Sequence, residues 1–409
     1  MLNFAKVRKK IIRILIKLTK DNKSFHGIDV SKIYIKKNFN FNYKKNSLSD
    51  GAINRIFSFA NYLKNQIEDS HKRDMWDTIT AHKDHKNLID YCVNKDKKKF
   101  LELILSSGKT KLIHGFLNWF HYKKLSSSNN ARYKESIQLL DKLISLAEYR
   151  KLIKVFNPEQ GGWLAENLDY DKLVEKIFTF DKKEILPFKS PNYTFGFNSN
   201  KRFYCLKDFK NFYTSIRLNE LSNIYDLKDV IEIGAGLGFT AYYFCKINHN
   251  NYNIYDLPTI LILQAYFLMS SIGENKVHLS GETKNKDSQI SLHPYWEIFD
   301  QTDSRKLLWV NQDSFPEIDF TLSKKYIEKI MLSKNSYLLS INQEARNDNS
   351  VGDTQHTLYD LLFPRGNCKL IYRSRDFLRL GYIEELYSIN QQDHIQKPTS
   401  NLSKILENK

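Results

Sequence analysis

The fold of this chain is decided by one run, VIEIGAGLG at residues 230–238, which joins a strand pattern to a glycine turn. Its first four residues predict a buried strand, and a helix pattern begins at Phe239. Gly234, Gly236 and Gly238 let the main chain turn tightly and approach a ligand without Cβ atoms in the way. The following helix presents unpaired backbone N–H groups above the turn. The run therefore predicts a nucleotide-like cofactor at the end of a strand.

Strand and helix patterns alternate from residue 208 onward. The expected strands are 229–233, 252–255, 276–279, 307–310 and 336–341, followed by a close pair at 368–375 and 378–387. This alternation predicts an α/β fold with a Rossmann-like, doubly wound and mostly parallel sheet. The late pair of strands predicts an antiparallel C-terminal edge strand.

Changes in composition divide the chain into four expected ranges. Residues 1–154 read as a helical N-terminal domain with a basic amphipathic first helix. Pro, Gly and Asn clusters mark 155–204 as a linker or loop region packed on the next domain. Residues 205–395 form the Rossmann-like domain, and 396–409 form a C-terminal tail.

The charge of the chain is strongly basic. Its 409 residues include 63 basic and 46 acidic side chains, which gives a formal net charge of +17. This balance suits nucleic acid, an anionic membrane surface or acidic substrates. Only 14 of the basic residues are arginines. Because arginine provides most bidentate recognition of phosphates and bases, the lysine excess disfavours nucleic acid as a partner.

Cysteine usage and hydropathy predict a cytoplasmic protein. The four cysteines form no C-x-x-C pair or tight Cys/His cluster, so we expect neither a disulfide framework nor a structural zinc site. No stretch reaches 18 uninterrupted apolar residues. Residues 1–20 combine apolar and basic positions at helical spacing. They predict either peripheral association with an anionic inner membrane leaflet or a first helix docked on the domain behind it.

The spacing around the glycine turn separates two kinds of cofactor. Phe239 stands where the dinucleotide motif G-x-G-x-x-G/A requires a small residue. Asp256 lies 256 − 234 = 22 residues beyond Gly234, close to the ~20 expected for a carboxylate that binds ribose hydroxyls. Capping of the helix that begins at Pro258 is its alternative role. With Glu232 directly before it, the G-x-G-x-G turn resembles the first motif of Rossmann-like S-adenosylmethionine-dependent methyltransferases.

Four later runs narrow this resemblance. They are IYDLPTILILQAYFL (254–268), LWVNQDSFPEID (308–319), SINQEA (340–345) and GYIEELY (381–387). Together they resemble the bacterial sugar O-methyltransferases over about residues 205–390. The resemblance implies S-adenosylmethionine as donor and a sugar hydroxyl of lipopolysaccharide, capsule or a related glycan precursor as acceptor. A sugar nucleotide or a lipid-linked sugar would carry that hydroxyl.

The resemblance also implies three groups of cofactor-binding residues. The first is the turn with the acidic residue in front of it, which orients the amino-acid end of the donor: Glu232, Gly234, Ala235, Gly236 and Gly238. In the second group, Asp256 would hold the ribose and Leu257 would lie beside the adenine. The third is Asn311, which would form the floor of the cofactor pocket.

Methyl transfer to a hydroxyl calls for a base, because a sugar hydroxyl is a poor nucleophile while it is protonated. Asp313 is the first candidate, since it follows the strand that carries Asn311. His356 and His293 are rivals, because imidazole titrates near neutral pH. Asp313 has an ordinary alternative role in holding a loop, and the histidines in covering the surface. No persuasive cluster of metal ligands is present, so we expect no metal.

Other side chains are candidates for acceptor binding. Tyr295 and Trp296 could stack on sugar rings, and Arg217 could pair with an acidic sugar or a phosphate. Two further functions remain open. One is an RNA methyltransferase or a methyltransferase acting on another small molecule. The other is a non-catalytic scaffold or glycan-binding module that keeps the same fold.

Overall fold

The computed structural model describes residues 39–43, 47–66, 80–113, 119–153, 169–301, 305–344, 356–362 and 368–391. The expected amphipathic helix at 1–20 and the C-terminal tail at 396–409 lie outside these ranges. Within them, no helix is both long enough and apolar enough to cross a membrane.

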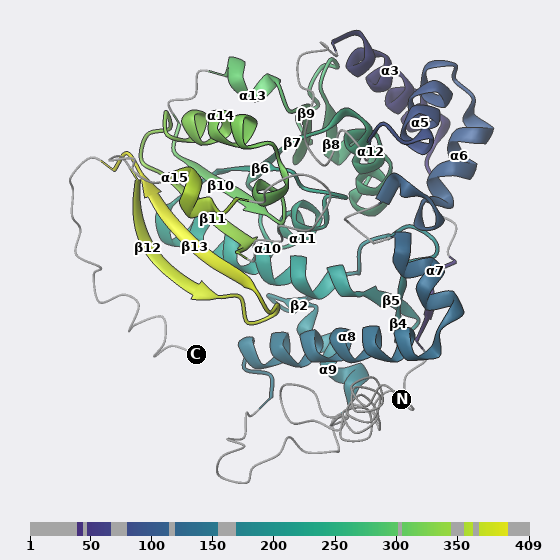
Figure 1. Ribbon diagram of the computed structural model, residues 1–409, viewed down its shortest axis with the longest axis horizontal. Helices are drawn as coiled ribbons and strands as arrows, with labels where there is room; N and C mark the ends of the chain where they lie inside the picture. Colours follow the sequence, from purple (N-terminus) through teal and green to yellow (C-terminus); the bar gives the residue numbers. More distant parts are fainter. Residues whose placement is uncertain are drawn as a thin grey trace, which may run out of the picture. The chain divides into compact units, whose positions relative to one another are not determined.

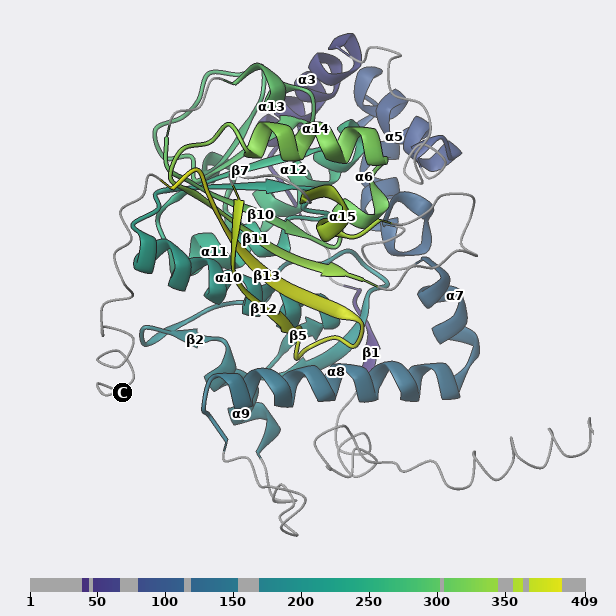
Figure 2. The ribbon, with the colours of Figure 1, turned by 60° about the vertical axis from the view of Figure 1, so that its left-hand side comes forward.

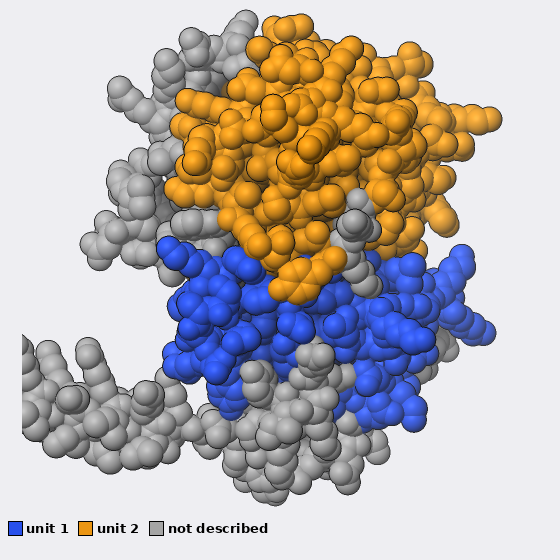
Figure 3. Space-filling view, turned by 90° about the vertical axis from the view of Figure 1, so that its right-hand side faces the viewer, with its two compact units in different colours: residues 1–42, 120–187, 194–210 blue, residues 43–119, 188–193, 211–409 orange. Residues whose placement is uncertain are grey.

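The chain forms two compact units, and each combines separate stretches of sequence (Figure 3). Unit 1 comprises Met1–Asn42, Phe120–Pro187 and Thr194–Lys210, and unit 2 comprises Tyr43–Trp119, Phe188–Tyr193 and Asn211–Lys409. Neither unit coincides with one of the four contiguous ranges expected from composition. Those ranges stay a prediction about domains.

Unit 1 contains a small antiparallel sheet with the strand order β1-β4-β5. Its strands are β1 (Phe39–Phe41), β4 (Phe195–Ser199) and β5 (Arg202–Cys205). Its other elements are α8 (Asn129–Tyr149), α9 (Tyr170–Ile177), β2 (Thr179–Phe180), β3 (Lys183–Glu184) and most of α7 (Trp119–Ser127). Arg150 closes the end of α9, because its guanidinium donates to the carbonyls of Lys176 at 3.0 Å and Thr179 at 2.8 Å.

Unit 2 is built on an eight-stranded sheet with the order β12-β13-β11-β10-β6-β7-β9-β8 (Figure 1). The strands are β6 (Asp229–Ile233), β7 (Asn251–Asp256), β8 (Val277–Leu279), β9 (Ile290–Pro294), β10 (Leu307–Gln312), β11 (Ser336–Gln343), β12 (Cys368–Arg375) and β13 (Tyr382–Ile389). All pairs from β11 to β8 are parallel. The predicted fold class, a mostly parallel doubly wound sheet, is confirmed.

The antiparallel strand β13, near the C-terminus, lies between two other strands of the sheet. β13 pairs antiparallel with both β11 and β12, so it lies one position in from the edge, and β12 forms the edge itself. The sequence also missed β9, which the structure inserts between β7 and β8. Its short run ISLHP ends in proline and has little of the apolar signal on which strand prediction depends.

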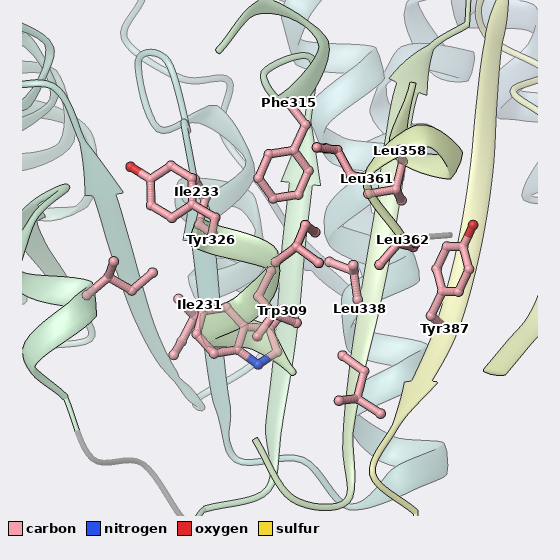
Figure 4. Packing of buried hydrophobic residues seen from close by; sticks show 14 of the residues in the cluster. Ile231, Ile233, Trp309, Phe315, Tyr326, Leu338, Leu358, Leu361, Leu362 and Tyr387 are labelled. Atoms are coloured by element: carbon pink, nitrogen blue, oxygen red, sulfur yellow. The ribbon is translucent and has the colours of Figure 1, made fainter. Parts of the chain in front are cut away.

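Helices cover both faces of this sheet. α13 (Glu297–Asp300), α14 (Phe320–Ile330) and α15 (Leu358–Leu362) contribute to a buried apolar cluster with one face of the strands (Figure 4). α11 (Phe239–Ile247) and the unit 2 part of α10 (Leu206–Tyr225) lie on the opposite face (Figure 2). Trp309 is at the centre of the cluster and is fully buried, with its indole N–H donating to Ser333 Oγ at 2.9 Å.

The helices from the N-terminal part of unit 2 are α3 (Asp50–Gln66), α5 (Lys83–Val93) and α6 (Lys97–Leu105). α3 packs on α12 (Pro258–Ile272). Arg55, on α3, binds to the segment that follows α12. The Arg55 guanidinium forms a bidentate ion pair with Glu282, at 2.6 and 3.0 Å, and donates to the carbonyls of Glu274 and Val277. α3, α5 and α6 belong to the same compact unit as the eight-stranded sheet.

Candidate functional site

The order of the strands defines where a ligand is expected. From β6 the chain continues to β7 on one side, and it later returns to β10 on the other side of β6. This reversal is a topological switch point, and ligands of doubly wound sheets bind at the carboxyl ends of the strands there. The glycine turn 234–238 follows β6, and the segment from Asp313 follows β10. The predicted motif therefore lies at the expected edge of the sheet.

The backbone of the turn requires glycine. Gly234, Gly236 and Gly238 have φ angles of 73°, 62° and 80°, in the left-handed region that side chains disfavour. A Cβ atom on Gly234 would lie 2.5 Å from Ser314 Oγ, and one on Gly238 would lie 2.9 Å from Leu268. Gly238 also precedes the first residue of α11, so the helix begins directly behind the turn. The turn is thus both tightly bent and closely packed.

Asn311, on the neighbouring strand β10, fixes this turn through hydrogen bonds. Its Nδ2 donates to the Ile233 carbonyl at 2.9 Å and to Ser314 Oγ, and its Oδ1 accepts from Phe315 N at 3.1 Å and from Asn342 Nδ2 at 2.9 Å. The side chain is fully buried. Its amide is therefore engaged with protein groups on both sides. In this structure Asn311 positions the turn, and its predicted contact with the cofactor stays a prediction.

Asp256 approaches the turn from β7. Its carboxylate accepts from Leu257 N at 2.8 Å and from Gln264 Nε2 at 2.7 Å, and the backbone N–H groups of Ala235 and Gly236 also donate to it. Burial raises the pKa of this carboxyl from its ordinary value of 3.8 to about 7, against the lowering effect of these hydrogen bonds. The cap of α12 is Leu257, which makes no side-chain capping bond. Asp256 therefore links the turn to the beginning of α12.

Gln264 was missed by the sequence reasoning. Its Nε2 bridges the Gly236 carbonyl, at 2.8 Å, and the Asp256 carboxylate. Because both partners are acceptors, this orientation of the amide is fixed, and Oε1 is left buried with no hydrogen-bond partner among the described residues. Gln264 lies eight positions after Asp256, two turns into α12. Because Asp256 is on β7 and not on the helix, helical spacing gave no signal that the two side chains meet.

Glu232 and Leu257 are the two remaining side chains predicted to bind the cofactor. Glu232 is buried and accepts a hydrogen bond from the Tyr252 hydroxyl at 2.9 Å, on the face of the sheet opposite the cluster that contains Ile231 and Ile233. Leu257 follows β7 and is half-buried. Neither placement tests the predicted contact with a donor.

Two of the three candidate bases, Asp313 and His293, lie apart. Asp313 follows β10 and is ion-paired with Arg379. His293 lies on β9, three strand positions away or about 14 Å at the usual strand spacing. Its Nδ1 is 2.8 Å from Ser280 Oγ and 3.1 Å from Glu297, so the ring is held in a network of its own. A joint catalytic role for these two residues is thus unsupported by the geometry.

His356 differs from the other candidates. Its ring packs edge-on against Phe320, and a backbone hydrogen bond to Phe315 occupies one nitrogen. Nε2 is buried and has no partner within the described part of the chain. Burial lowers the pKa of the imidazole, outweighing the opposite effect of Asp360 and Asp319, so the neutral form is favoured. A neutral imidazole with an unbonded nitrogen is suited to accept a proton.

Two further polar groups at this edge were not singled out from the sequence. Gln312, the last residue of β10, is buried, and its Nε2 has no partner in the described ranges. Its Oε1 is 3.4 Å from Thr240 Oγ1, near the beginning of α11. Arg379 is nine-tenths buried, and its Nη2 has no partner there either.

The predicted acceptor side chains are occupied elsewhere. Arg217 donates to Glu384 at 3.1 Å, to Tyr372 at 2.9 Å and to Glu220, so its expected role with an acidic ligand finds no support. Trp296 donates to Gln66 at 3.3 Å. Across the described residues, no group of three His, Cys, Asp or Glu side chains could hold a metal ion.

Comparisons with known proteins find similar solved structures at low sequence identity. No family model and no curated protein matches the chain. An O-methyltransferase from Bacillus cereus, solved with S-adenosylhomocysteine, is 9% identical over 44% of this chain and 80% of its own, with a TM-score of 0.30. Magnesium protoporphyrin IX methyltransferase from Synechocystis, also solved with S-adenosylhomocysteine, is 10% identical over 45% and 82%, with a TM-score of 0.34. Likeness at this level carries no argument about activity, and the fold assignment rests on the strand order above.

Replacing Gly234 by alanine is expected to destabilise the turn by several kcal/mol, because strain at positive φ adds to the clash with Ser314. Gly381→Ala is the matched control: its φ is 83°, and nothing lies within 4 Å of the added Cβ. It should cost only about 1–2 kcal/mol. Urea unfolding of both variants measures the difference. Equal losses would contradict the close packing of the turn.

The raised pKa of Asp256 predicts a pH-dependent stability. A carboxyl whose pKa is higher in the folded than in the unfolded chain favours folding while protonated, and this contribution is lost as pH rises from about 4 through about 7. The free energy of unfolding of the wild type, relative to Asp256→Asn, should therefore fall between pH 5, inside this range, and pH 8, about one unit above its upper end. Urea titrations at both values measure it. Asp287→Asn, at an exposed position, is the control and should show no such trend. A constant difference for Asp256→Asn would refute the raised pKa.

Proposed function

We propose that this chain transfers a methyl group from S-adenosylmethionine to a hydroxyl of a sugar in a cell-surface glycan precursor. The observation that carries the proposal is the glycine turn at the switch point, held between Asp256 with Gln264 on one side and Asn311 with Ser314 on the other. Two groups beside it, Gln264 Oε1 and Gln312 Nε2, are buried without partners in the part of the chain that the structure describes.

These groups fit an adenosyl cofactor. Asp256 and Gln264 Oε1 are acceptors suited to the two hydroxyl protons of a ribose. On the β10 side, Gln312 Nε2 is a donor suited to the carboxylate of the donor's amino-acid end. Buried polar groups normally have partners, so a ligand that satisfies both would stabilise this edge of the sheet. When bound, S-adenosylmethionine supplies a methyl group on a positively charged sulfur.

The residues of the chain then have separate tasks. The turn and Asp256 hold the cofactor, and exclusion of water follows from the burial of this edge. His356 Nε2 is the group we assign to accept the proton of the acceptor hydroxyl, because it is neutral and unbonded among the described residues. Asp313, the first candidate from the sequence, is instead ion-paired with Arg379. We assign Asp313 to positioning this arginine.

The other functions have less support. Four arginines of the described ranges, Arg55, Arg217, Arg373 and Arg379, are ion-paired with carboxylates and so are engaged within the protein. RNA recognition therefore lacks the guanidinium groups it mostly uses. A non-catalytic scaffold remains the second candidate, favoured by the network that occupies His293. A peripheral position at the inner membrane through residues 1–20, next to lipid-linked sugars, is part of the proposal.

Cofactor binding is tested by titration calorimetry with S-adenosylhomocysteine. The wild type should bind it, and Asp256→Ala should weaken binding about 10–100-fold, because the ribose loses a hydrogen-bond acceptor. Asp287→Ala is the control with an exposed aspartate and should bind as the wild type does. Transfer of label from S-adenosylmethionine into an extract of glycan precursors then tests the reaction. Absence of binding by the wild type would overturn the proposal.

His356→Gln tests the proton acceptor. It should lower kcat about 10²–10⁴-fold while S-adenosylhomocysteine binds as before, because the variant keeps an amide in place of the imidazole but cannot accept the proton. The wild-type rate should rise with pH and reach its plateau at a lower pH than an imidazole of ordinary pKa would give, because burial lowers the pKa of His356. His249→Gln, at an exposed histidine, is the control. Activity of His356→Gln within about twofold of the wild type would remove His356 from the mechanism.

A further inference from the structure

The turn between β12 and β13 lies at the same edge of the sheet as the glycine turn. β13 runs antiparallel to β11, so its first residue, Tyr382, pairs with Gln343 at the carboxyl end of β11. Glu344 N donates to the Gly381 carbonyl at 3.1 Å, which ties the turn to that end. Because the carboxyl ends of parallel strands share one edge, the turn borders the region where an acceptor must approach the cofactor.

Arg379, in this turn, is held rigidly. Its Nε donates to Asp376 at 2.8 Å, and its Nη1 donates to Asp313. The guanidinium also lies 3.7 Å from the ring centroid of Tyr382, a cation–π contact. Asp313 comes directly after β10, with φ at 62°, and its N–H donates to the Ile341 carbonyl at 3.2 Å. An arginine from one hairpin is thus fixed against the residue that follows the strand at the switch point.

One donor of Arg379 is left over. Its side chain is 10% exposed, and Nη2 is buried without a hydrogen-bond partner in the described ranges. A buried guanidinium N–H without an acceptor is costly, and such groups call for a partner. Leu380, the next residue, is 87% exposed, so the tip of the turn is open to solvent.

The charges around Arg379 decide what kind of oxygen it can bind. Asp313 and Asp376 are both ion-paired with Arg379, so two carboxylates already flank its single positive charge. A carboxylate or phosphate ligand would be repelled by these groups. An uncharged hydroxyl or carbonyl oxygen can accept from Nη2 without that penalty.

We infer that Arg379 is a specificity-determining residue of the acceptor site, and that its Nη2 donates a hydrogen bond to an uncharged oxygen of the acceptor. Asp313 and Asp376 position the guanidinium for this contact. The site selects neutral sugars over uronic acids and phosphorylated sugars, although the chain as a whole is basic. This inference rests on the proposed function, because it takes the methyl acceptor to be the ligand at this edge.

The inference is tested on the full chain by saturation-transfer NMR with methyl glucoside, methyl mannoside and methyl galactoside, each beside the matching uronic acid. The neutral glycosides should bind, and the uronic acids should bind at least about tenfold more weakly. Arg379→Lys keeps the charge between the two aspartates but cannot supply all three contacts, so neutral glycosides should bind it about tenfold more weakly. Arg379→Gln should show the same loss. Arg375→Lys, at an exposed arginine of the same hairpin, should bind as the wild type does.

Three results would overturn the inference: no neutral glycoside binds the wild type, uronic acids bind at least as well, or Arg379→Lys binds normally. Thermal unfolding of each variant checks that it is folded. Each titration is run with and without S-adenosylhomocysteine, whose own binding is measured separately. If that compound binds and the glycosides do not, the inference fails alone. If glycosides bind in the predicted pattern and S-adenosylhomocysteine does not, the proposed function fails and Arg379 remains part of a sugar-binding site.

Discussion

The site depends on how one bend of the main chain is held in place. The Ile233 carbonyl, at the end of β6, accepts hydrogen bonds from Asn311 and from Ser314, which belong to and follow the neighbouring strand β10. From the other neighbour, β7, Asp256 accepts from the backbone of the turn. The turn is therefore clamped between the two strands that flank the switch point. Without this clamp, the glycines would give freedom to the chain instead of a fixed surface for a ligand.

This clamp also explains which polar groups remain available. Buried amides that hold the turn, such as Asn311, use all their capacity on protein partners. Gln264 uses only one end of its amide, and within the described ranges Gln312 and Arg379 likewise keep donors without partners. These groups lie along the same edge of the sheet, from α12 across β10 to the β12–β13 turn. A ligand that extends along this edge would satisfy groups that the protein alone leaves unpaired.

Much of the fold could be predicted because its signals are local. The strand before the glycine turn is apolar, and Pro258 marks the start of α12 where its missing N–H costs nothing. β9 was missed because it is short and ends in proline. The pairing of α3 with the sheet unit was missed for another reason. It depends on Arg55 reaching Glu282, 227 positions away, and a single sequence carries no signal of such a contact.

The site was predictable to a similar extent. Glycine spacing and the position of Asp256 are properties of a short segment, and the structure brings both to the turn. The sequence analysis ranked Asp313 first among the candidate bases, but their suitability depends on partners distant in sequence. Arg379 neutralises Asp313 from 66 positions away, and Ser280 and Glu297 engage His293. Only the absence of a partner at His356 Nε2, judged over the described residues, separates it from the others.

A crystal structure of the full chain with S-adenosylhomocysteine tests the central claim most directly. The account predicts the ribose hydroxyls at Asp256 and Gln264 Oε1, with the amino-acid end over the turn at 234–238 and near Gln312. A compound bound elsewhere on the chain, or a turn that stays closed over Asp256 at saturating concentration, would contradict it.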